Sequence, residues 1–172
     1  SMRDIKIEKV TLNMGTGGPG EELEKAIKLL KTLTGEKPIT TKTKKRIPTW
    51  GIRPGLEIGC KVTLRGKKGE SFLKKLFEAK KNSLNPSNFD NQGNFSFGIQ
   101  EHIDIPGAEY DMALGIMGLE AAVTLMRPGL RIKLRRIMQR KIPKKQKITK
   151  EESMEFIKNK YSINMGEQND NK

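Results

Sequence analysis

The sequence has little of the chemistry that enzymes and metal sites use. Among its 172 residues there is one cysteine, Cys60, and one histidine, His102. A lone cysteine cannot form an internal disulfide, and the two residues supply neither a metal cluster nor a Cys/His nucleophile pair. No cationic start with an apolar core and a cleavage site opens the chain. We therefore expect no catalytic site, metal or cofactor, and a reducing, cytoplasmic setting.

Long apolar runs and excess negative charge are also missing. No apolar stretch has the length of a membrane span, and no basic helix carries a bulky apolar face. Lys and Arg number 34 against 20 Asp and Glu, which leaves a formal net charge of +14. A polyanion that neutralises part of this charge is the expected partner. Of the two common candidates, an anionic membrane and nucleic acid, the composition favours nucleic acid.

Hydrophobic periodicity predicts the fold class. Apolar and polar residues alternate, as in half-buried strands, in segments 4–14, 58–64, 95–105, 119–125 and 130–134. A phase slip between Ile7 and Val10 predicts a bulge. Apolar residues at helical spacing follow the glycines at 15–20 and continue as far as Gly35. A second segment with helical spacing follows the glycines at 66–69. We expect an α+β fold, with helices packed on one face of a mostly antiparallel sheet and the other face partly open and cationic.

The predicted organisation has three parts. Residues 1–148 form one α+β RNA-binding domain that includes a basic loop at 42–55 and a basic strand at 130–145. A capping-box pattern, Thr149 to Glu152, begins a docking helix within 149–165. The polar tail 166–172 is expected to be disordered. His102, on the polar side of a strand end, is expected to be solvated or hydrogen-bonded.

The glycine run after the first strand allows three interpretations. Gly15, Gly17 and Gly20 fit the G-x-G-x-x-G pattern of a dinucleotide site, placed between a strand and a helix. Such a site also needs an acidic residue at the end of a parallel second strand, whereas Glu36 precedes the next strand. The run can equally be a tight turn. A third interpretation is a turn whose amides, with Asn13, approach an RNA backbone.

The basic loop surrounds Trp50, the only tryptophan, with cations and breaks in regular structure. An exposed ring among lysines and arginines can stack on a base while its neighbours bind phosphates. The alternative is a tryptophan that anchors the loop to the protein's own core. Both interpretations remain open at this point.

Six segments together resemble one protein family. They are IEKVTLNMG at 7–15, GEKPITTK at 35–42, IRPG at 52–55, IGCKVTLRG at 58–66, FDNQGNFSFG at 89–98 and MRPG at 126–129. In this order they are similar to the L-five family of large-subunit ribosomal proteins, in its archaeal or eukaryotic cytosolic form. The resemblance covers nearly the whole chain.

The resemblance implies a ribosomal protein without enzymatic activity. It would bind 5S rRNA and large-subunit rRNA in the central protuberance, beside neighbouring ribosomal proteins, and touch P-site tRNA with its basic loop. The positions that would face 5S rRNA are Asn13, Met14, Gly15, Glu36, Lys37, Lys61, Thr63 and Arg65. The tRNA-facing positions are Lys44, Lys45, Arg46, Trp50 and Arg53. Other rRNA would contact Arg131, Lys133, Arg135 and Arg136. A non-ribosomal RNA chaperone and a nucleotide-dependent enzyme are the competing hypotheses.

Overall fold

The computed structural model describes residues 1–108, 110–112 and 114–166. A five-stranded sheet with the strand order β2-β3-β1-β6-β5 forms its centre, and every neighbouring pair in it is antiparallel. Its strands are β1 (Lys6–Gly15), β2 (Ile39–Lys42), β3 (Glu57–Leu64), β5 (Phe95–Ile99) and β6 (Leu119–Met126). A short parallel pair, β4 (Ser83–Leu84) with β7 (Asn164–Met165), lies apart from it.

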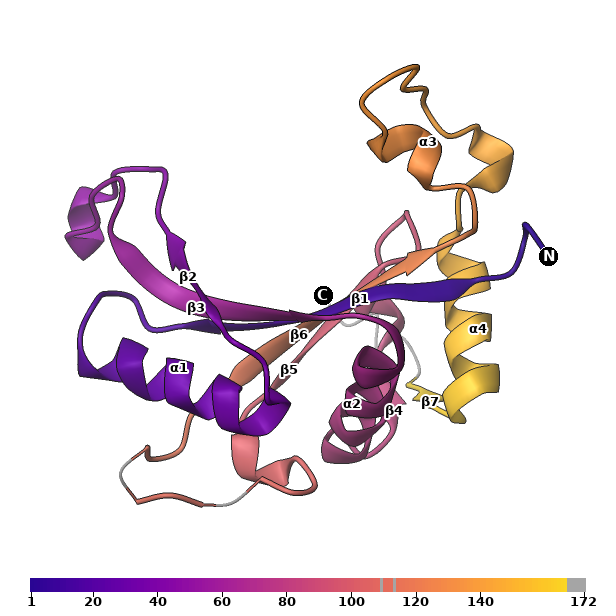
Figure 1. The fold of residues 1–172 in the computed structure, drawn as a ribbon. Helices are drawn as coiled ribbons and strands as arrows, with labels where there is room; N and C mark the ends of the chain where they lie inside the picture. Colours follow the sequence, from indigo (N-terminus) through magenta and orange to yellow (C-terminus); the bar gives the residue numbers. More distant parts are fainter. Residues whose placement is uncertain (109, 113, 167–172) are drawn as a thin grey trace.

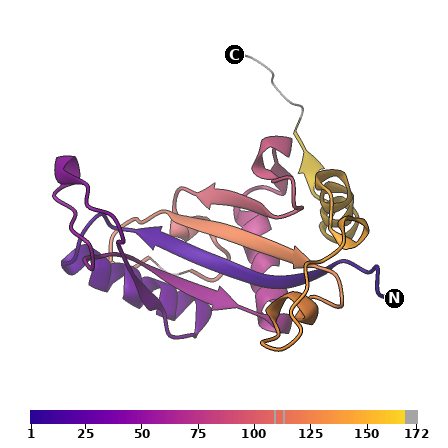
Figure 2. The same cartoon turned by 90° about the horizontal axis from the view of Figure 1, so that it is seen from above.

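The two long helices, α1 (Glu21–Thr34) and α2 (Gly66–Ala79), pack on the same face of the sheet (Figure 1). The core lies between them and the sheet, and its fully buried residues include Leu12 of β1, Leu30 of α1 and Leu73 of α2. Among the described residues, no helix lies over the opposite face of the sheet (Figures 1 and 2). The predicted α+β class and the mainly antiparallel sheet with helices on one face are confirmed.

Local sequence signals set the ends of several elements. The register of β1 against β6 shifts between Ile7 and Lys9, which confirms the predicted bulge. Helix α1 ends at Gly35, which adopts a left-handed conformation with φ of 67° and donates its N–H to the carbonyl of Lys31. The predicted capping box is present at the start of α4 (Lys150–Tyr161), where Thr149 and Glu152 hydrogen-bond reciprocally.

Helix α4 docks at one end of the sheet. Ile157 is fully buried in the core, and the buried hydroxyl of Ser153 donates a 2.7 Å hydrogen bond to the carbonyl of Gly93. Arg127, just after β6, donates a 2.8 Å hydrogen bond to the Glu152 carboxylate. Of the predicted disordered tail, Gly166 donates to the carbonyl of Leu84 at 3.0 Å, while 167–172 lie outside the described residues.

The strand predicted at 95–105 is too long. Strand β5 stops at Ile99, and a 3-10 turn spans His102–Asp104. His102 is fully buried, not solvated, and its Nδ1 accepts a 3.3 Å hydrogen bond from the Met117 N–H. A spacing of three places His102 and Ile105 on the same side of a 3-10 turn, so both are buried. The alternation of apolar residues at 103–105 therefore indicated a strand that the structure does not contain.

The basic strand predicted at 130–145 is also wrong. The segment forms a single helical turn, α3 (Arg131–Leu134), irregular backbone and a 3-10 turn at Lys144–Gln146. Leu134 is 68% exposed, so the alternating residues face no core. The physical reason is the sheet order, because β6 already pairs with β1 and β5 and offers no edge to a following strand. Backbone groups bond locally instead, as Arg135 does to Arg131 at 2.8 Å.

No helix in the described part of the chain combines the length and apolar character that crossing a lipid bilayer requires.

Candidate nucleic-acid interface

The uncovered face of the sheet, which we call the open face, is built from cross-strand rows. Asn13 lies opposite Lys61 of β3 on one side and Glu120 of β6 on the other. Paired residues in a sheet project to the same face, so these side chains form one row. The adjacent row comprises Thr63, Thr11, Ala122 and Ser96. Small side chains therefore occupy the middle of the face.

Two basic segments border the open face. The hairpin arm, residues 43–56, joins β2 to β3, and the C-terminal arm, residues 127–147, runs from β6 to α4. Figure 1 shows both arms rising from the side of the sheet opposite α1 and α2, one at each end. The result is a face with small side chains in its middle, between two cationic projections.

The hairpin arm has its own backbone structure. The N–H of Ile47 donates to the carbonyl of Ile52 at 2.9 Å, and the reverse bond measures 3.1 Å. A 3-10 turn, Pro48–Trp50, closes its tip, and Ile52, two residues after the turn, is buried. Trp50 is 72% exposed, so the interpretation of this ring as a core anchor is wrong. The arm holds the indole ring outward.

The charged residues of the hairpin arm are free for a ligand. All four predicted cations are exposed, and none forms an ion pair with another described residue: Lys44, Lys45, Arg46 and Arg53. At the base of the arm, Lys42 Nζ lies 3.6 Å from the carboxylate of Glu57.

The C-terminal arm is exposed in its middle, where every residue from 131 to 140 is exposed. This stretch contains the predicted rRNA-binding positions Arg131, Lys133, Arg135 and Arg136. Arg135 Nε donates to the carbonyl of Met138 at 2.9 Å, which holds its side chain against the arm itself. Gln146 Nε2 donates to the carbonyl of Met2 at 2.7 Å, so the base of the arm is tied to the N-terminus.

The structure brings only part of the predicted 5S rRNA set together. Asn13, Lys61 and Thr63 share the open face. Met14 is 2% exposed, with its side chain in the core, so only its backbone can reach a ligand on the open face. Gly15 is exposed at the end of β1.

The other three members of the predicted set lie away from that row. Glu36 accepts a 2.5 Å hydrogen bond from Lys68 at the start of α2, and Lys37 is its exposed neighbour before β2. Arg65, which precedes α2, lies 3.8 Å from the Glu8 carboxylate. These residues occupy the rim of the sheet near the start of α2.

Several open-face residues were missed by the sequence analysis: Lys9, Thr11, Ser96, Glu120, Ala122 and Thr124. Period-two spacing from Asn13 predicts Thr11 and Lys9 on the same side of β1. The residues of β5 and β6 carry no such signal, because the sequence does not state which strands are neighbours.

The glycine run is a tight strand-to-helix turn. The amides of Thr16 and Gly17 both donate to the carbonyl of Ile58, at 3.0 and 3.2 Å, so they are satisfied within the protein. Strand β1 is flanked by antiparallel β3 and β6, which rules out the parallel βαβ unit of a dinucleotide site.

Comparison with known proteins places the chain in a family. The family model described as "Ribosomal protein L5" matches residues 1–53, and a second model, for the C-terminus of the same ribosomal protein family, matches residues 57–156. The large ribosomal subunit protein uL5 of Sulfurisphaera tokodaii is 48% identical over 167 residues, covering 96% of this chain and 94% of its own. The uL5 protein of Nanoarchaeum equitans is 51% identical over 163 residues, covering 94% and 96%.

These matches decide between the competing hypotheses. The relatives are named as components of the large ribosomal subunit, which are structural proteins rather than enzymes. The similarity extends over nearly the full length of both chains, so it includes the open face and both arms. The chain belongs to the L5 family of large-subunit ribosomal proteins, and it is a structural constituent of the ribosome that binds RNA.

Proposed function

We propose that this protein binds 5S rRNA across its open face and attaches it to large-subunit rRNA in the central protuberance, in the cytoplasmic ribosome. The observation that carries this proposal is the arrangement of the open face between two cationic arms, on the side that the helices leave bare. Neighbouring ribosomal proteins and P-site tRNA complete its set of partners.

Small hydroxyl and amide side chains suit the shape of folded RNA. Structured RNA presents 2′-hydroxyls and sugar edges in a wide, shallow minor groove, which a flat surface can approach. On the open face, Thr11 and Thr63 are direct cross-strand partners, and Asn13 is adjacent to them along β1. Their hydroxyl and amide groups can exchange hydrogen bonds with 2′-hydroxyls, which distinguishes RNA from DNA.

The arms supply affinity and reach. Exposed lysines and arginines that neutralise phosphates release counterions, and this release dominates the free energy of binding at low salt. The C-terminal arm, with Arg131, Lys133, Arg135 and Arg136, holds large-subunit rRNA. The hairpin arm, with Trp50 at its tip, extends toward P-site tRNA, where the ring stacks against a nucleotide.

The rim residues Glu36, Lys37 and Arg65 extend the 5S rRNA surface beyond the open face. Lys37 and Arg65 are exposed and can reach phosphates. Met14 and Gly15 contribute through their backbone, since one side chain is buried and the other is absent.

A competition titration tests this function. Labelled 5S rRNA is displaced from the protein by tRNA or by an unrelated hairpin of similar size, at about 0.15 M salt. We expect a preference for 5S rRNA of about a hundredfold or more, because specific nucleic-acid binding typically exceeds non-specific binding by at least that much. The preference should fall when Asn13 and Thr63 are both replaced by alanine. Equal binding of all three RNAs would contradict the proposal.

A matched control separates the open face from the rest of the surface. Asn159 of α4 and Thr32 of α1 are exposed residues of the same two types, outside the open face. Their replacement by alanine should leave the preference unchanged. If about six phosphates are neutralised, log affinity should fall against log salt with a slope of roughly −4 to −5. A slope near zero would remove the phosphate-binding role of the arms.

A further inference from the structure

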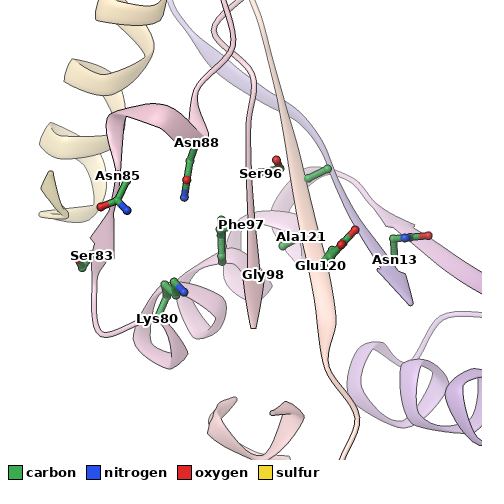
Figure 3. Close-up of a pocket in the computed structure, with 11 residues that line it drawn as sticks. Asn13, Lys80, Ser83, Asn85, Asn88, Ser96, Phe97, Gly98, Glu120 and Ala121 are labelled. Carbon is green, nitrogen blue, oxygen red and sulfur yellow. The ribbon is translucent and has the colours of Figure 1, made fainter. Parts of the chain in front are cut away.

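A groove lies along the edge strand β5, on the half of the open face farthest from the hairpin arm. Its volume is about 570 Å³, within the range of small-ligand sites. Figure 3 shows Asn85 and Asn88 on one side of β5, and Glu120 and Asn13 on the other. Gly98 of β5 lies between these two walls.

The polar side chains of the groove have no partners within the described protein. Those of Asn13, Asn85, Asn88 and Glu120 form no hydrogen bond or ion pair with another described residue. These four groups line the same groove, and their hydrogen-bonding capacity is not used within the described protein. A ligand that enters the groove can replace water at these groups without breaking a hydrogen bond within the described protein.

The bare floor of the groove is not required by the fold. A Cβ added at Gly98 would meet no atom within 4 Å, and the backbone there is outside the left-handed region. Gly59, in contrast, needs to lack a side chain, because its Cβ would lie 2.5 Å from the carbonyl oxygen of Met14. Glycine in a strand interior weakens the strand unless something approaches closely. Gly98 lies directly opposite Glu120 in the sheet, so the space it leaves open faces that carboxylate.

The charge in the groove selects the chemical group that it accepts. Glu120 is exposed on the open face, and a carboxylate there repels phosphates and accepts hydrogen bonds. Guanine is the one common base that presents two adjacent donors, N1–H and the N2 amino group, to a bidentate carboxylate. The amides of Asn85 and Asn88 can donate to the acceptors of the same base. Lys80, exposed at the rim, can bind the attached phosphate.

We infer that this groove binds one unpaired guanine of the bound RNA, with Glu120 accepting hydrogen bonds from N1 and N2. Sequence-specific RNA recognition usually reads bases that are splayed out of a helix, which matches a groove beside a flat RNA-binding face. The inference rests on the proposed function, in that the guanine belongs to an RNA that the open face holds. It adds a site that recognises one base to a surface that otherwise recognises the shape and the phosphates of the RNA.

The test uses short oligouridines that carry one central guanosine, adenosine or inosine, with binding to the full-length protein measured by fluorescence anisotropy. We expect the guanosine oligomer to bind about tenfold or more tightly than the adenosine one, the discrimination typical of a bidentate base contact. Inosine keeps N1–H but lacks the N2 amino group, so it should bind with intermediate affinity. Equal binding of the three oligomers would overturn the inference.

The Glu120→Gln variant distinguishes base reading from phosphate binding by the sign of its effect. If Glu120 accepts from guanine, the variant loses the preference for guanosine and binds that oligomer more weakly. If the groove only attracts phosphates, removing a negative charge tightens all three oligomers equally, and the inference fails. Glu101→Gln makes the same charge change at an exposed site outside the groove and should preserve the guanosine preference.

A second variant, Gly98→Val, fills the groove from its floor. Its added atoms enter open space, and valine suits a strand, so circular dichroism and thermal melting should resemble those of the wild type. The guanosine preference should disappear, and its survival in a folded Gly98→Val protein would overturn the inference.

Parallel titrations with 5S rRNA separate this inference from the proposed function. If the wild type prefers 5S rRNA but shows no guanosine preference, the groove assignment fails and the proposed function stands. If guanosine is preferred but 5S rRNA is not, the proposed function fails and the groove remains a base-binding site.

Discussion

The two halves of the open face share one backbone architecture but differ in chemistry. On the β3–β1 side, Lys61 and Lys9 project from the strands on the open face. On the β6–β5 side, the chain from residue 82 to 126 contains no lysine or arginine at all. The acidic residues of that stretch are Asp90, Glu101, Asp104, Glu109, Asp111 and Glu120.

This difference shows that strand pattern and ligand chemistry are independent properties of the sheet. Alternation fixes which residues face outward, and the identity of the outward residues decides what they contact. Lysines on one half suit phosphates, whereas amides, hydroxyls and a single carboxylate on the other half suit base edges and sugars. Substitutions in one half of the face, or at a residue that both halves contact, can distinguish the contributions of the two halves experimentally.

The largest expected effect is a loss of stability at a residue on which both halves depend. Leu12 of the central strand is fully buried, with Val62 opposite it on one side and Ala121 on the other. Leu12→Ala should lower the free energy of unfolding by about 3–5 kcal/mol, because it leaves a cavity between both halves and the helices. Thr11→Ala, one residue away on the open face, should cost less than about 1 kcal/mol. Urea unfolding measures both, and equal losses would contradict the division of the strand into two faces.

The next effect concerns charge on the C-terminal arm. Replacing Arg131, Lys133, Arg135 and Arg136 together by glutamine should weaken rRNA binding by about 10²–10³-fold at moderate salt, and flatten the log–log salt slope by about 3 to 4. The control replaces Lys28, Lys31, Lys74 and Lys75, which are exposed on α1 and α2. The same loss of charge there should have a much smaller effect. An equal effect would show that only net charge matters.

Moving a positive charge from one half to the other should have a smaller effect on the salt dependence of RNA binding. Lys61→Gln removes one cation from the β3–β1 half, and Ala122→Lys adds one to the β6–β5 half, next to Thr11 and Ser96. If both halves lie against phosphates, the two variants shift the salt slope by about 0.7–0.9 in opposite directions. If the β6–β5 half contacts bases instead, Ala122→Lys should leave the slope of specific binding unchanged. Titrations at several salt concentrations decide between them.

The smallest expected effect is on the pH dependence of local stability at Glu152 of α4, which is bonded to Arg127 at the start of the C-terminal arm. The backbone N–H of Thr149, and then Arg127, hydrogen-bond the Glu152 carboxylate and hold its pKa below the usual value. A lowered folded-state pKa gives stability that is present above the unfolded-state pKa and is lost as pH falls through the lowered value. The protection of amides in α4 and the arm, measured as their exchange rate relative to that of unstructured peptide at the same pH, should therefore fall in acid. Glu152→Gln should flatten this pH dependence, whereas Glu155→Gln, on the same helix, should preserve it.

Much of the fold could be predicted from local patterns. The bulge near Ile7, the end of α1 at Gly35 and the capping box at Thr149 all depend on neighbouring residues, so short sequence motifs located them. The wrong predictions concern features that depend on distant segments of the chain. The alternation at 130–134 and at 103–105 would indicate strands only if partner strands were available, and availability is a property of the whole sheet.

The candidate interface divides in the same way. Lys44, Lys45, Arg46 and Arg53 could be assigned to an exposed basic loop from composition, but the exposure of Trp50 could not. A tryptophan in a short loop can turn inward or outward, and here it ends a 3-10 turn that leaves its ring exposed while Ile52 is buried instead. The groove beside β5 had no signal in the sequence, because its walls come from four separate parts of the chain.

The sequence by itself determined the positive charge, the alternating strands, both long helices and the family of this protein. Only the tertiary structure decided that Asn13 lies between Lys61 and Glu120, and that two basic arms border one face of the sheet. The physical reason is that periodicity and capping act over a few residues, whereas strand order depends on pairing between distant segments. Those pairings join lysine, asparagine and glutamate into one surface, and so they determine which parts of an RNA this surface can contact.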